Sequence, residues 1–241
     1  MTNEYKTAIV TGASQGIGAG LVTAFQRNGY RVVANSRNIS KTNSFTASAD
    51  LVLVEGDIGK RETAAKIVEA AISRFGTIDV LVNNAGIFIP KLFTEYTVDD
   101  FDALVSTNLA GFFHVSQLAV KQMLKQKSGS IVNISTTLVD QPLAGVPAAL
   151  QVLTKGGLNA VTRALAIEYA TQGIRVNTVG AGIVDTPMHK PDTHEFLKTL
   201  QPMGRIAKIE EIVDAVLYLT EAKFVTGEVL HVDGGAHAGK W

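Results

Sequence analysis

The chain has 241 residues, of which 46% are hydrophobic and 18% are charged. This composition is typical of a folded globular protein and excludes a disordered one. Lys plus Arg and Asp plus Glu both number 22, so no net charge favours nucleic acid or an anionic membrane, and we expect a small-molecule partner. The absence of cysteine excludes disulfides, thiolate metal sites and a cysteine nucleophile.

The hydropathy pattern predicts a soluble, cytoplasmic protein. No apolar stretch precedes the first predicted strand, and no apolar run approaches the ~18 residues of a membrane span. No linker rich in Pro, Gly or Ser divides the chain and no internal repeat is present, so we expect one domain over residues 1–241.

Short β-branched runs alternate with segments of helical periodicity. The predicted strands are 7–11, 31–36, 51–55, 80–83, 130–135, 175–179 and 228–232. The predicted helices are 17–28, 61–75, 98–126, 147–170 and 209–220. Thr97 and Asp100 have the spacing of a capping box before the third helix, while the Ser/Thr-rich segment 38–50 predicts a short or irregular element. Apolar strands separated by helices indicate a parallel sheet covered on both faces.

A glycine-rich loop follows the first strand. The run T-G-A-S-Q-G-I-G occupies 11–18 and leads into the first helix. Gly12, Gly16 and Gly18 would permit a tight turn, a close approach of backbone N–H groups to a pyrophosphate, and close helix packing. The position between strand and helix favours a dinucleotide-binding loop over a simple glycine turn.

Six further motifs follow in order: N-N-A-G (83–86), T-N-L-A-G (107–111), L-T-K-G-G-L (153–158), I-R-V-N (174–177), T-P-M (186–188) and V-D-G-G (232–235). With the glycine loop, they resemble the short-chain dehydrogenase/reductase family over essentially the whole chain. The resemblance implies a Rossmann-like, doubly wound α/β fold. Its seven-stranded parallel sheet carries helices on both faces and binds a nicotinamide dinucleotide at the carboxyl ends of the strands.

The resemblance also assigns cofactor contacts. It places the pyrophosphate and ribose at Gly12, Ser14, Gly16, Ile17 and Gly18. It implies that Asp57 holds the adenine, that Asn84, Ala85 and Gly86 form a wall behind the adenosine ribose, and that Thr186 meets the nicotinamide carboxamide.

The end of the second strand bears on the choice between NAD and NADP. Ser36 and Arg37 stand where family members that use NAD carry an acidic residue for the ribose 2′-hydroxyl. A guanidinium suits a 2′-phosphate, so we predict NADP. Gln15 argues against this, because NADP users of the family often have a basic residue there. A solvated surface arginine is the alternative interpretation.

The catalytic positions depart from the family pattern. Lys155 matches the family's lysine, which the resemblance implies also binds the nicotinamide ribose. Gln151, four residues before it, stands where the family has a tyrosine that supplies the proton. Positions i and i+4 share a helix face, so these two side chains should lie side by side. Glutamine has no proton to release, although its amide can donate a hydrogen bond. Loss of a general acid typically lowers the rate by about 10²–10⁴-fold.

The family's serine has several candidates in N-I-S-T-T at 133–137: Ser135, Thr136 or Thr137. Thr136 fits the motif's second hydroxyl position best, and the loop before Gln151 is a few residues longer than in the family. The proline of the family's P-G after the sixth strand is Ala181 here. The resemblance implies that Asn108 kinks its helix and holds a water.

The histidines suggest no metal site. His189 lies in the segment that closes over substrate in this family and is a candidate proton donor, although a solvated loop histidine is the more ordinary reading. No role is assigned to His114, His194, His231 and His237, which lack metal-ligand spacing.

Two functions remain open. The first is an atypical NADP(H)-dependent oxidoreductase acting on a carbonyl, alcohol or quinone-like compound. In it Lys155, the ribose hydroxyl and a water held by Asn108 relay the proton, while Gln151 and a Ser or Thr hydroxyl orient the carbonyl. The second is a dinucleotide-binding sensor or partner subunit with little turnover. A methyltransferase is a weaker third reading, because it has no use for this glycine loop or for Lys155. The resemblance implies a homotetramer or homodimer packed through Ala160, Ala164 and Leu165.

Overall fold

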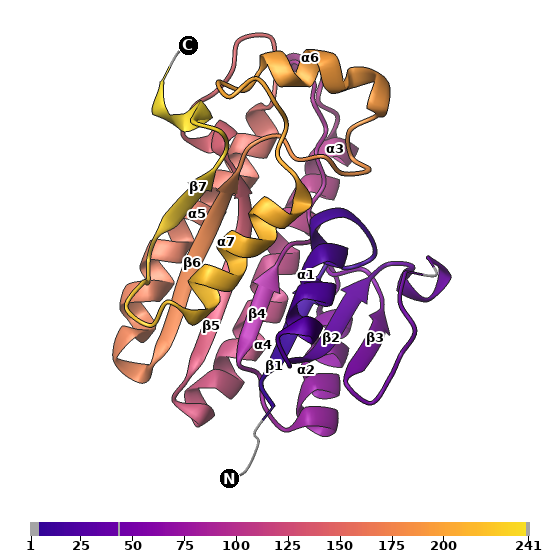
Figure 1. Cartoon of the computed structure of the whole chain (residues 1–241), viewed down its shortest axis with the longest axis vertical. Coiled ribbons are helices and arrows are strands. Elements are labelled where there is room, and N and C mark those ends of the chain that lie inside the picture. The colour runs from indigo at the N-terminus through magenta and orange to yellow at the C-terminus, as the bar shows by residue number, and fades with distance from the viewer. Residues whose placement is uncertain (1–4, 43, 240–241) are drawn as a thin grey trace.

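A seven-stranded parallel sheet forms the centre of the molecule in the computed structural model, which describes residues 5–42 and 44–239 (Figure 1). The strands are β1 (Thr7–Thr11), β2 (Arg31–Ser36), β3 (Leu51–Glu55), β4 (Val80–Asn83), β5 (Gly129–Thr136), β6 (Ile174–Ala181) and β7 (Val229–Val232). Their order is β3-β2-β1-β4-β5-β6-β7, and every neighbouring pair is parallel. The expected Rossmann-like, doubly wound fold class is confirmed. The strand order reverses between β1 and β4, from which the two halves of the sheet extend outward.

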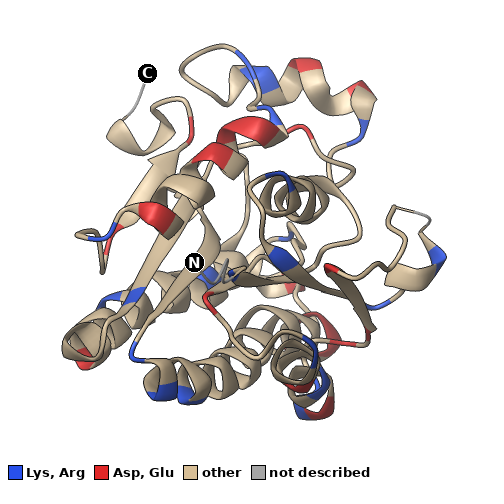
Figure 2. Ribbon diagram, turned by 60° about the horizontal axis from the view of Figure 1, so that its bottom comes forward, with Lys and Arg blue, Asp and Glu red and all other residues tan. Residues whose placement is uncertain are grey.

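Helices cover both faces of the sheet because successive strand residues point to opposite sides. Val10 and Val32 face α1 (Gly16–Arg27) and α7 (Ile209–Glu221) in one apolar core. Ile9 and Val33 face the other core, formed with α2 (Arg61–Phe75), α4 (Gly111–Gln126) and α5 (Ala149–Tyr169). The charged residues on the outer helices are unevenly distributed, with only acidic ones on α7, only basic ones on α4 and both kinds on α2 (Figure 2).

The predicted helix 98–126 is interrupted once. It consists of α3 (Val98–Leu104), a π-helical turn (Val105–Ala110) and α4. The capping box is confirmed, because the Asp100 backbone N–H donates to Thr97 Oγ1 at 3.2 Å and the Thr97 N–H donates to Asp100 Oδ2 at 2.9 Å. The π turn adds a residue to the helical register at Asn108, a distortion typical of functional sites.

Two segments of the chain contain only short helical turns, and the first of them was expected to be irregular. Segment 38–50 contains a single 3₁₀ turn, Ile39–Lys41, within its described residues. Beyond β6, a 3₁₀ turn (Pro191–Thr193) and a short helix α6 (His194–Thr199) form a lid over the carboxyl end of the sheet (Figure 1). The sequence pattern did not predict α6, because its polar and apolar residues show no clear periodicity.

By length and composition alone, the helical stretch Val98–Gln126 is long and apolar enough to cross a membrane. Its side chains Val115, Ala119 and Met123 are buried in the same core as Ile67 of α2. Packing within the fold therefore accounts for part of its apolar surface, while Phe101, Phe113 and Leu124 of the same stretch are exposed. That no segment spans a membrane stays a prediction.

Candidate active site

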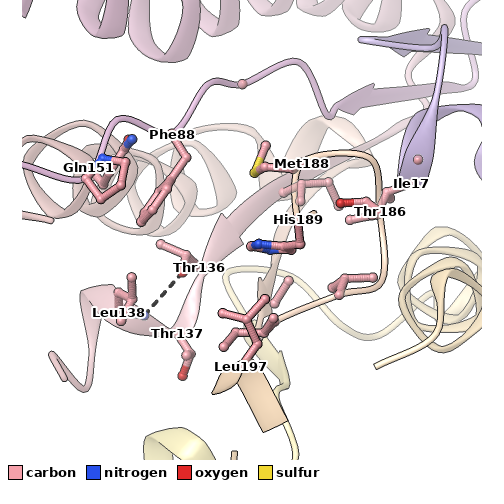
Figure 3. A pocket seen from close by; sticks show the side chains of 18 of the residues that line it. Ile17, Phe88, Thr136, Thr137, Leu138, Gln151, Thr186, Met188, His189 and Leu197 are labelled. Atoms are coloured by element: carbon pink, nitrogen blue, oxygen red, sulfur yellow. Dashed lines mark hydrogen bonds between the residues drawn. The ribbon is translucent and has the colours of Figure 1, made fainter. Parts of the chain in front are cut away.

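A cavity of about 660 Å³ opens at the carboxyl ends of β1, β4, β5 and β6. Its walls come from the glycine loop, the segment after β4, the β5–α5 segment and the lid after β6. Figure 3 shows Gln151, Phe88 and Thr136 along one side, with Thr186, Met188 and His189 of the lid facing them. Ligands bind at this edge in doubly wound folds, and the volume is that of a small-molecule site.

The glycine loop leaves room for a ligand at the start of α1. Gly12 and Gly16 have φ angles of 65° and 56°, in the left-handed region that favours glycine. A Cβ on Gly18 would lie 2.1 Å from the Gly12 carbonyl oxygen, so only glycine permits this packing. The N-cap, Gln15, makes no side-chain capping bond, which leaves the first backbone N–H groups of α1 available to a phosphate.

Asn84 braces this loop. Its Nδ2 donates to the carbonyl oxygens of Thr11 at 2.9 Å and Gly12 at 3.1 Å. Thr11 Oγ1 in turn accepts the backbone N–H groups of Asn84 and Ala85, both at 3.1 Å. The resemblance made Asn84 and Ala85 a ribose wall, and both line the cavity. The structure adds that Asn84 holds the phosphate loop in shape.

Four of the predicted cofactor contacts lie outside the cavity lining. Ser14, Ser36, Arg37 and Asp57 are absent from its walls, and Arg37 and Asp57 are exposed beyond the ends of β2 and β3. Asp57 Oδ1 accepts the Gly59 N–H at 2.9 Å. Their roles at the cofactor stay predictions.

Sequence analysis missed a carboxylate at this end of the site. Glu55 is the register partner of Ser36 across β2 and β3 and is hydrogen-bonded by the Ser40 hydroxyl. Strand register brings together residues far apart in sequence, and no motif at the end of β2 indicates that a residue of β3 lies beside it. The Glu55 carboxylate of β3 therefore lies near the end of β2, where NAD-using family members have an acidic residue and β2 of this chain has none.

Lys155 reaches into the cavity from α5. Its Nζ donates to the carbonyl oxygen of Ile134 at 2.7 Å, and burial lowers its pKa to about 8. A Cβ on Gly86 would lie 3.0 Å from this Nζ and 3.4 Å from Asn108 Oδ1. Gly86 therefore allows the segment after β4 to approach both side chains.

Asn108 and Gln151 form a buried amide network whose orientation is fixed by the backbone. The Ile87 N–H donates to Asn108 Oδ1 at 3.0 Å, and Asn108 Nδ2 donates to the Ile87 carbonyl oxygen at 3.3 Å, so this backbone residue fixes the Asn108 amide. That nitrogen donates to Thr154 Oγ1 at 3.2 Å and to Gln151 Oε1 at 3.4 Å. The Gln151 amide nitrogen is thereby turned away from Asn108.

This nitrogen, Gln151 Nε2, has no hydrogen-bond partner within the described part of the chain. Gln151 lines the cavity and is only 1% exposed. A buried polar group without a partner costs about 1–3 kcal/mol. Its two hydrogens therefore suit an acceptor oxygen supplied by a ligand.

The three candidate hydroxyls have different surroundings. Ser135 Oγ donates to the Lys155 carbonyl oxygen at 3.4 Å, and Thr137 Oγ1 donates to Asp233 Oδ2 at 2.5 Å. Thr136 Oγ1 accepts the Leu138 N–H at 3.3 Å and keeps its own proton to donate. Figure 3 shows the Thr137 hydroxyl turned away from Gln151. These contacts favour Thr136 for the serine role.

The lid brings Thr186 against the glycine loop. A Cβ on Gly16 would lie 3.3 Å from Thr186 Cβ, so the two motifs face each other where the resemblance places the cofactor. His189 also lines the cavity. Its pKa is lowered by burial and by His194, against an opposing effect of Asp185, which favours the neutral imidazole.

Apolar residues form most of the substrate side, and sequence reasoning did not single them out. They share positions just beyond strand ends or in the lid: Phe88, Leu138, Leu143, Val146, Ile183, Leu197 and Leu200. No Asp or Glu lines the cavity. No group of three or more His, Cys, Asp or Glu side chains suited to a metal ion occurs among residues 5–42 and 44–239.

Comparison with known proteins identifies the family of the chain. A family profile described as Enoyl-(Acyl carrier protein) reductase matches residues 12–237. The 3-oxoacyl-[acyl-carrier-protein] reductase FabG of Thermotoga maritima is 34% identical, over 98% of this chain and 99% of that protein. The corresponding Staphylococcus aureus protein is 32% identical over 96% and 98%.

Solved structures agree with the sequence relatives. ElxO with NADP bound has a TM-score of 0.89 and 30% identity, covering 98% of this chain and 100% of that one. The 3-ketoacyl-(acyl-carrier-protein) reductase of Brucella melitensis complexed with NADH has a TM-score of 0.88 and 31% identity, with coverage of 97% and 99%. The motifs, the sheet order and these relatives show that the chain belongs to the short-chain dehydrogenase/reductase family.

Proposed function

We propose that residues 1–241 act as one unit, an NADP(H)-dependent oxidoreductase that reduces a carbonyl or quinone-like group on an apolar small molecule, or oxidises the corresponding alcohol. The observation that carries this proposal is the unpaired Nε2 of Gln151 in an apolar cavity beside Lys155. Both curated relatives described above are named as reductases. We also propose that the protein works in the cytoplasm, where a chain without cysteine is at no disadvantage.

The residues present fit a nicotinamide dinucleotide. Close packing at Gly12, Gly16 and Gly18 and the uncapped start of α1 form a phosphate cradle. The cavity contains Lys155 and no carboxylate, so its electrostatics suit a polyanionic ligand. When bound, the cofactor would supply or accept the hydride.

We propose that two hydrogen-bond donors would stabilise the carbonyl oxygen as it develops negative charge. Gln151 Nε2 would donate to that oxygen, and Thr136 Oγ1 would supply a second hydrogen bond. Such donors stabilise an oxyanion without transferring a proton and are each worth about 10²–10³ in rate. Gln151 therefore orients and polarises the carbonyl but leaves proton supply to another group.

Lys155 is the proposed proton source. With a pKa lowered to about 8 by burial, its ammonium can release a proton near neutral pH more readily than an ordinary lysine. Asn108 lies beside it and has the hydrogen-bonding capacity to hold a water. We propose that Lys155 and a water held by Asn108 would supply the proton to the carbonyl oxygen, and that Lys155 would also hold the ribose of the cofactor when it is bound.

The same glutamine supports a second candidate function. Because Gln151 cannot act as an acid, a dinucleotide-binding sensor or partner subunit also fits the cavity. The test has two measurements. Fluorescence titration measures NADPH binding, and a second assay measures NADPH oxidation in the presence of ethyl acetoacetate or 9,10-phenanthrenequinone. Turnover with either compound supports the oxidoreductase. Tight NADPH binding without turnover favours the sensor.

Two observations support a preference for NADP over NAD. They are Arg37 at the end of β2 and the solved structures of the relative ElxO with NADPH and with NADP. Another relative holds NADH, and Glu55 stands beside Ser36. We therefore propose that Arg37 forms an ion pair with the 2′-phosphate, and that this attraction exceeds the repulsion between the phosphate and Glu55. Arg37→Ala should weaken NADPH binding by about tenfold, the value of one charge-assisted contact, and leave NADH binding unchanged. Fluorescence titration measures both dissociation constants.

Glu55→Gln serves as the matched control for Arg37→Ala. It removes the carboxylate near the same position, so NADPH should bind as well as or better than before. Lower dissociation constants for NADH than for NADPH in the native chain would reverse the NADP assignment.

We propose a homodimer or homotetramer packed through α5. Ala160 and Ala164 are exposed and Leu165 is partly buried, while Leu153 and Ile167 of the same helix are 58% and 81% exposed. Exposed apolar side chains along one helix are typical of a subunit interface. Light scattering should report a dimer or tetramer for the native chain and a smaller species for Ile167→Glu. A native monomer at micromolar concentration would contradict the proposal.

A further inference from the structure

The V-D-G-G motif at 232–235 lies beside the segment that connects β5 to α5. This segment, residues 137–148, lines the substrate side of the cavity with Leu138, Leu143, Val146 and Pro147. It contains a single 3₁₀ turn, Thr137–Val139, within the described chain, so little local structure holds it in place. Figure 1 shows the yellow C-terminal turn at the same end of the sheet.

Asp233 makes the first tie between the two segments. The Thr137 hydroxyl donates to Asp233 Oδ2 at 2.5 Å, a length typical of a charge-assisted bond. Gly234 and Gly235 have φ angles of 61° and 89°, which allow a tight turn. The turn directs the N–H groups of Gly235 and His237 at the same carboxylate, at 3.0 and 2.9 Å.

Asp233 remains ionised although it is only 3% exposed. Burial acts to raise its pKa, but the hydrogen bonds from Thr137, His237 and Gly235 outweigh burial and lower the pKa below its usual value. A buried carboxylate depends on every donor it has, because an uncompensated buried charge is costly. Removing the Thr137 donor therefore affects the whole arrangement.

Two histidines make the second tie. The ring nitrogen Nε2 of His231, on β7, lies 3.0 Å from Asp140 Oδ2 in the connecting segment. The His231 ring stacks on that of His237 with centroids 3.9 Å apart, and His237 Nδ1 lies 2.9 Å from Asp233 Oδ2. One cluster therefore holds segment 137–148 at both Thr137 and Asp140.

We propose that Asp233 is a positioning residue for substrate binding: with His231 and His237, it clamps segment 137–148 against the C-terminal turn and so sets the substrate wall of the cavity. The clamp touches neither Lys155 nor the glycine loop. It should therefore affect substrate affinity more than cofactor binding or the chemical step. The kinetic part of this inference rests on the proposed oxidoreductase function; the structural part does not.

Hydrogen exchange followed by mass spectrometry tests the structural part without turnover. Thr137→Val removes the hydroxyl and keeps the side-chain shape, and Thr137→Ser keeps the hydroxyl. Amides in 138–146 should exchange about tenfold faster in Thr137→Val, as expected for loss of one hydrogen bond to a buried charge. In Thr137→Ser they should exchange at close to the native rate. His231→Phe, which retains a ring for stacking but not the Asp140 contact, should also exchange faster.

The matched control is Glu221→Gln. Glu221 accepts hydrogen bonds from Tyr30 and Lys6, so this change weakens the hydrogen bonds of a carboxylate elsewhere in the fold without touching the clamp. Exchange in 138–146 should be unchanged in this variant. Equal exchange in Thr137→Val and Thr137→Ser, or loosening of the same amides by Glu221→Gln, would overturn the clamp.

Kinetics with ethyl acetoacetate and NADPH test the positioning role. Thr137→Val should raise the KM for ethyl acetoacetate about fivefold, change kcat by less than about twofold and leave the NADPH dissociation constant unchanged. Thr137→Ser should restore the native KM. A fall in kcat with unchanged KM would contradict a positioning role. If the native protein shows no turnover, the proposed oxidoreductase function fails while hydrogen exchange still decides the clamp.

Discussion

The Gln151→Tyr variant should reduce carbonyl compounds at least about tenfold faster than the native chain, because a phenol would add the general acid that the glutamine lacks. Gln151 and Lys155 are four residues apart on α5 and share one helix face. The Lys155 ammonium would lower the pKa of the phenol and favour proton release. Imperfect placement by ~1 Å would limit the gain to the low end of the range expected for general acid catalysis. NADPH oxidation with ethyl acetoacetate and 9,10-phenanthrenequinone measures this change.

Gln151→Phe is the matched control, since it adds the same ring without the hydroxyl. Both variants lose the contact between Gln151 Oε1 and Asn108 Nδ2, so any difference between them belongs to the phenol. Gln151→Phe should be no faster than the native chain. Equal rates for Phe and Tyr at position 151, both above native, would attribute the gain to cavity shape and exclude the missing acid as its cause.

The strand pattern predicted the fold closely because each buried strand is a continuous apolar run. β1, β2 and β3 begin and end where the sequence places them. β5 and β6 extend further than predicted, to Thr136 and Ala181. Both extensions end in motif residues: Thr136 is a candidate for the serine role, and Ala181 stands where the family has a proline. The lid helix α6 was not predictable, because its six residues show only weak helical periodicity.

The sequence predicted the site where local motifs define it and failed where long-range pairing does. The glycine loop is one short motif, and Gln151 and Lys155 belong to another. The structure brings both motifs to one cavity. The fates of the three hydroxyls, by contrast, depend on distant partners. Thr137 is held by Asp233, 96 residues away, and Glu55 reaches Ser36 through strand register. No signal in N-I-S-T-T itself separates Thr136 from its neighbours.

Lys155→Ala should weaken NADPH binding by about tenfold or more and lower residual turnover by at least about 10²-fold, if Lys155 both contacts the cofactor and feeds the proton relay. Among residues 5–42 and 44–239 its Nζ has one hydrogen-bond partner, the Ile134 carbonyl oxygen, so two of its three N–H groups remain available to ligands. Lys155→Arg is the control for charge. A guanidinium retains the positive charge but does not release a proton near neutral pH, so binding should survive while turnover is lost.

The pH dependence gives an independent reading of the same residue. Because burial lowers the Lys155 pKa to about 8, its ammonium is present below that pH and is lost above it. The native rate should therefore fall as pH rises through about 8, and this limb should be absent from any residual rate of Lys155→Arg. Robust turnover that survives Lys155→Ala, with no limb near pH 8, would exclude the lysine relay. The proton would then have to come from another cavity group, and His189 is the first candidate because it lines the same cavity. Since burial and His194 lower its pKa, a His189-driven rate would decline already below the ordinary imidazole range.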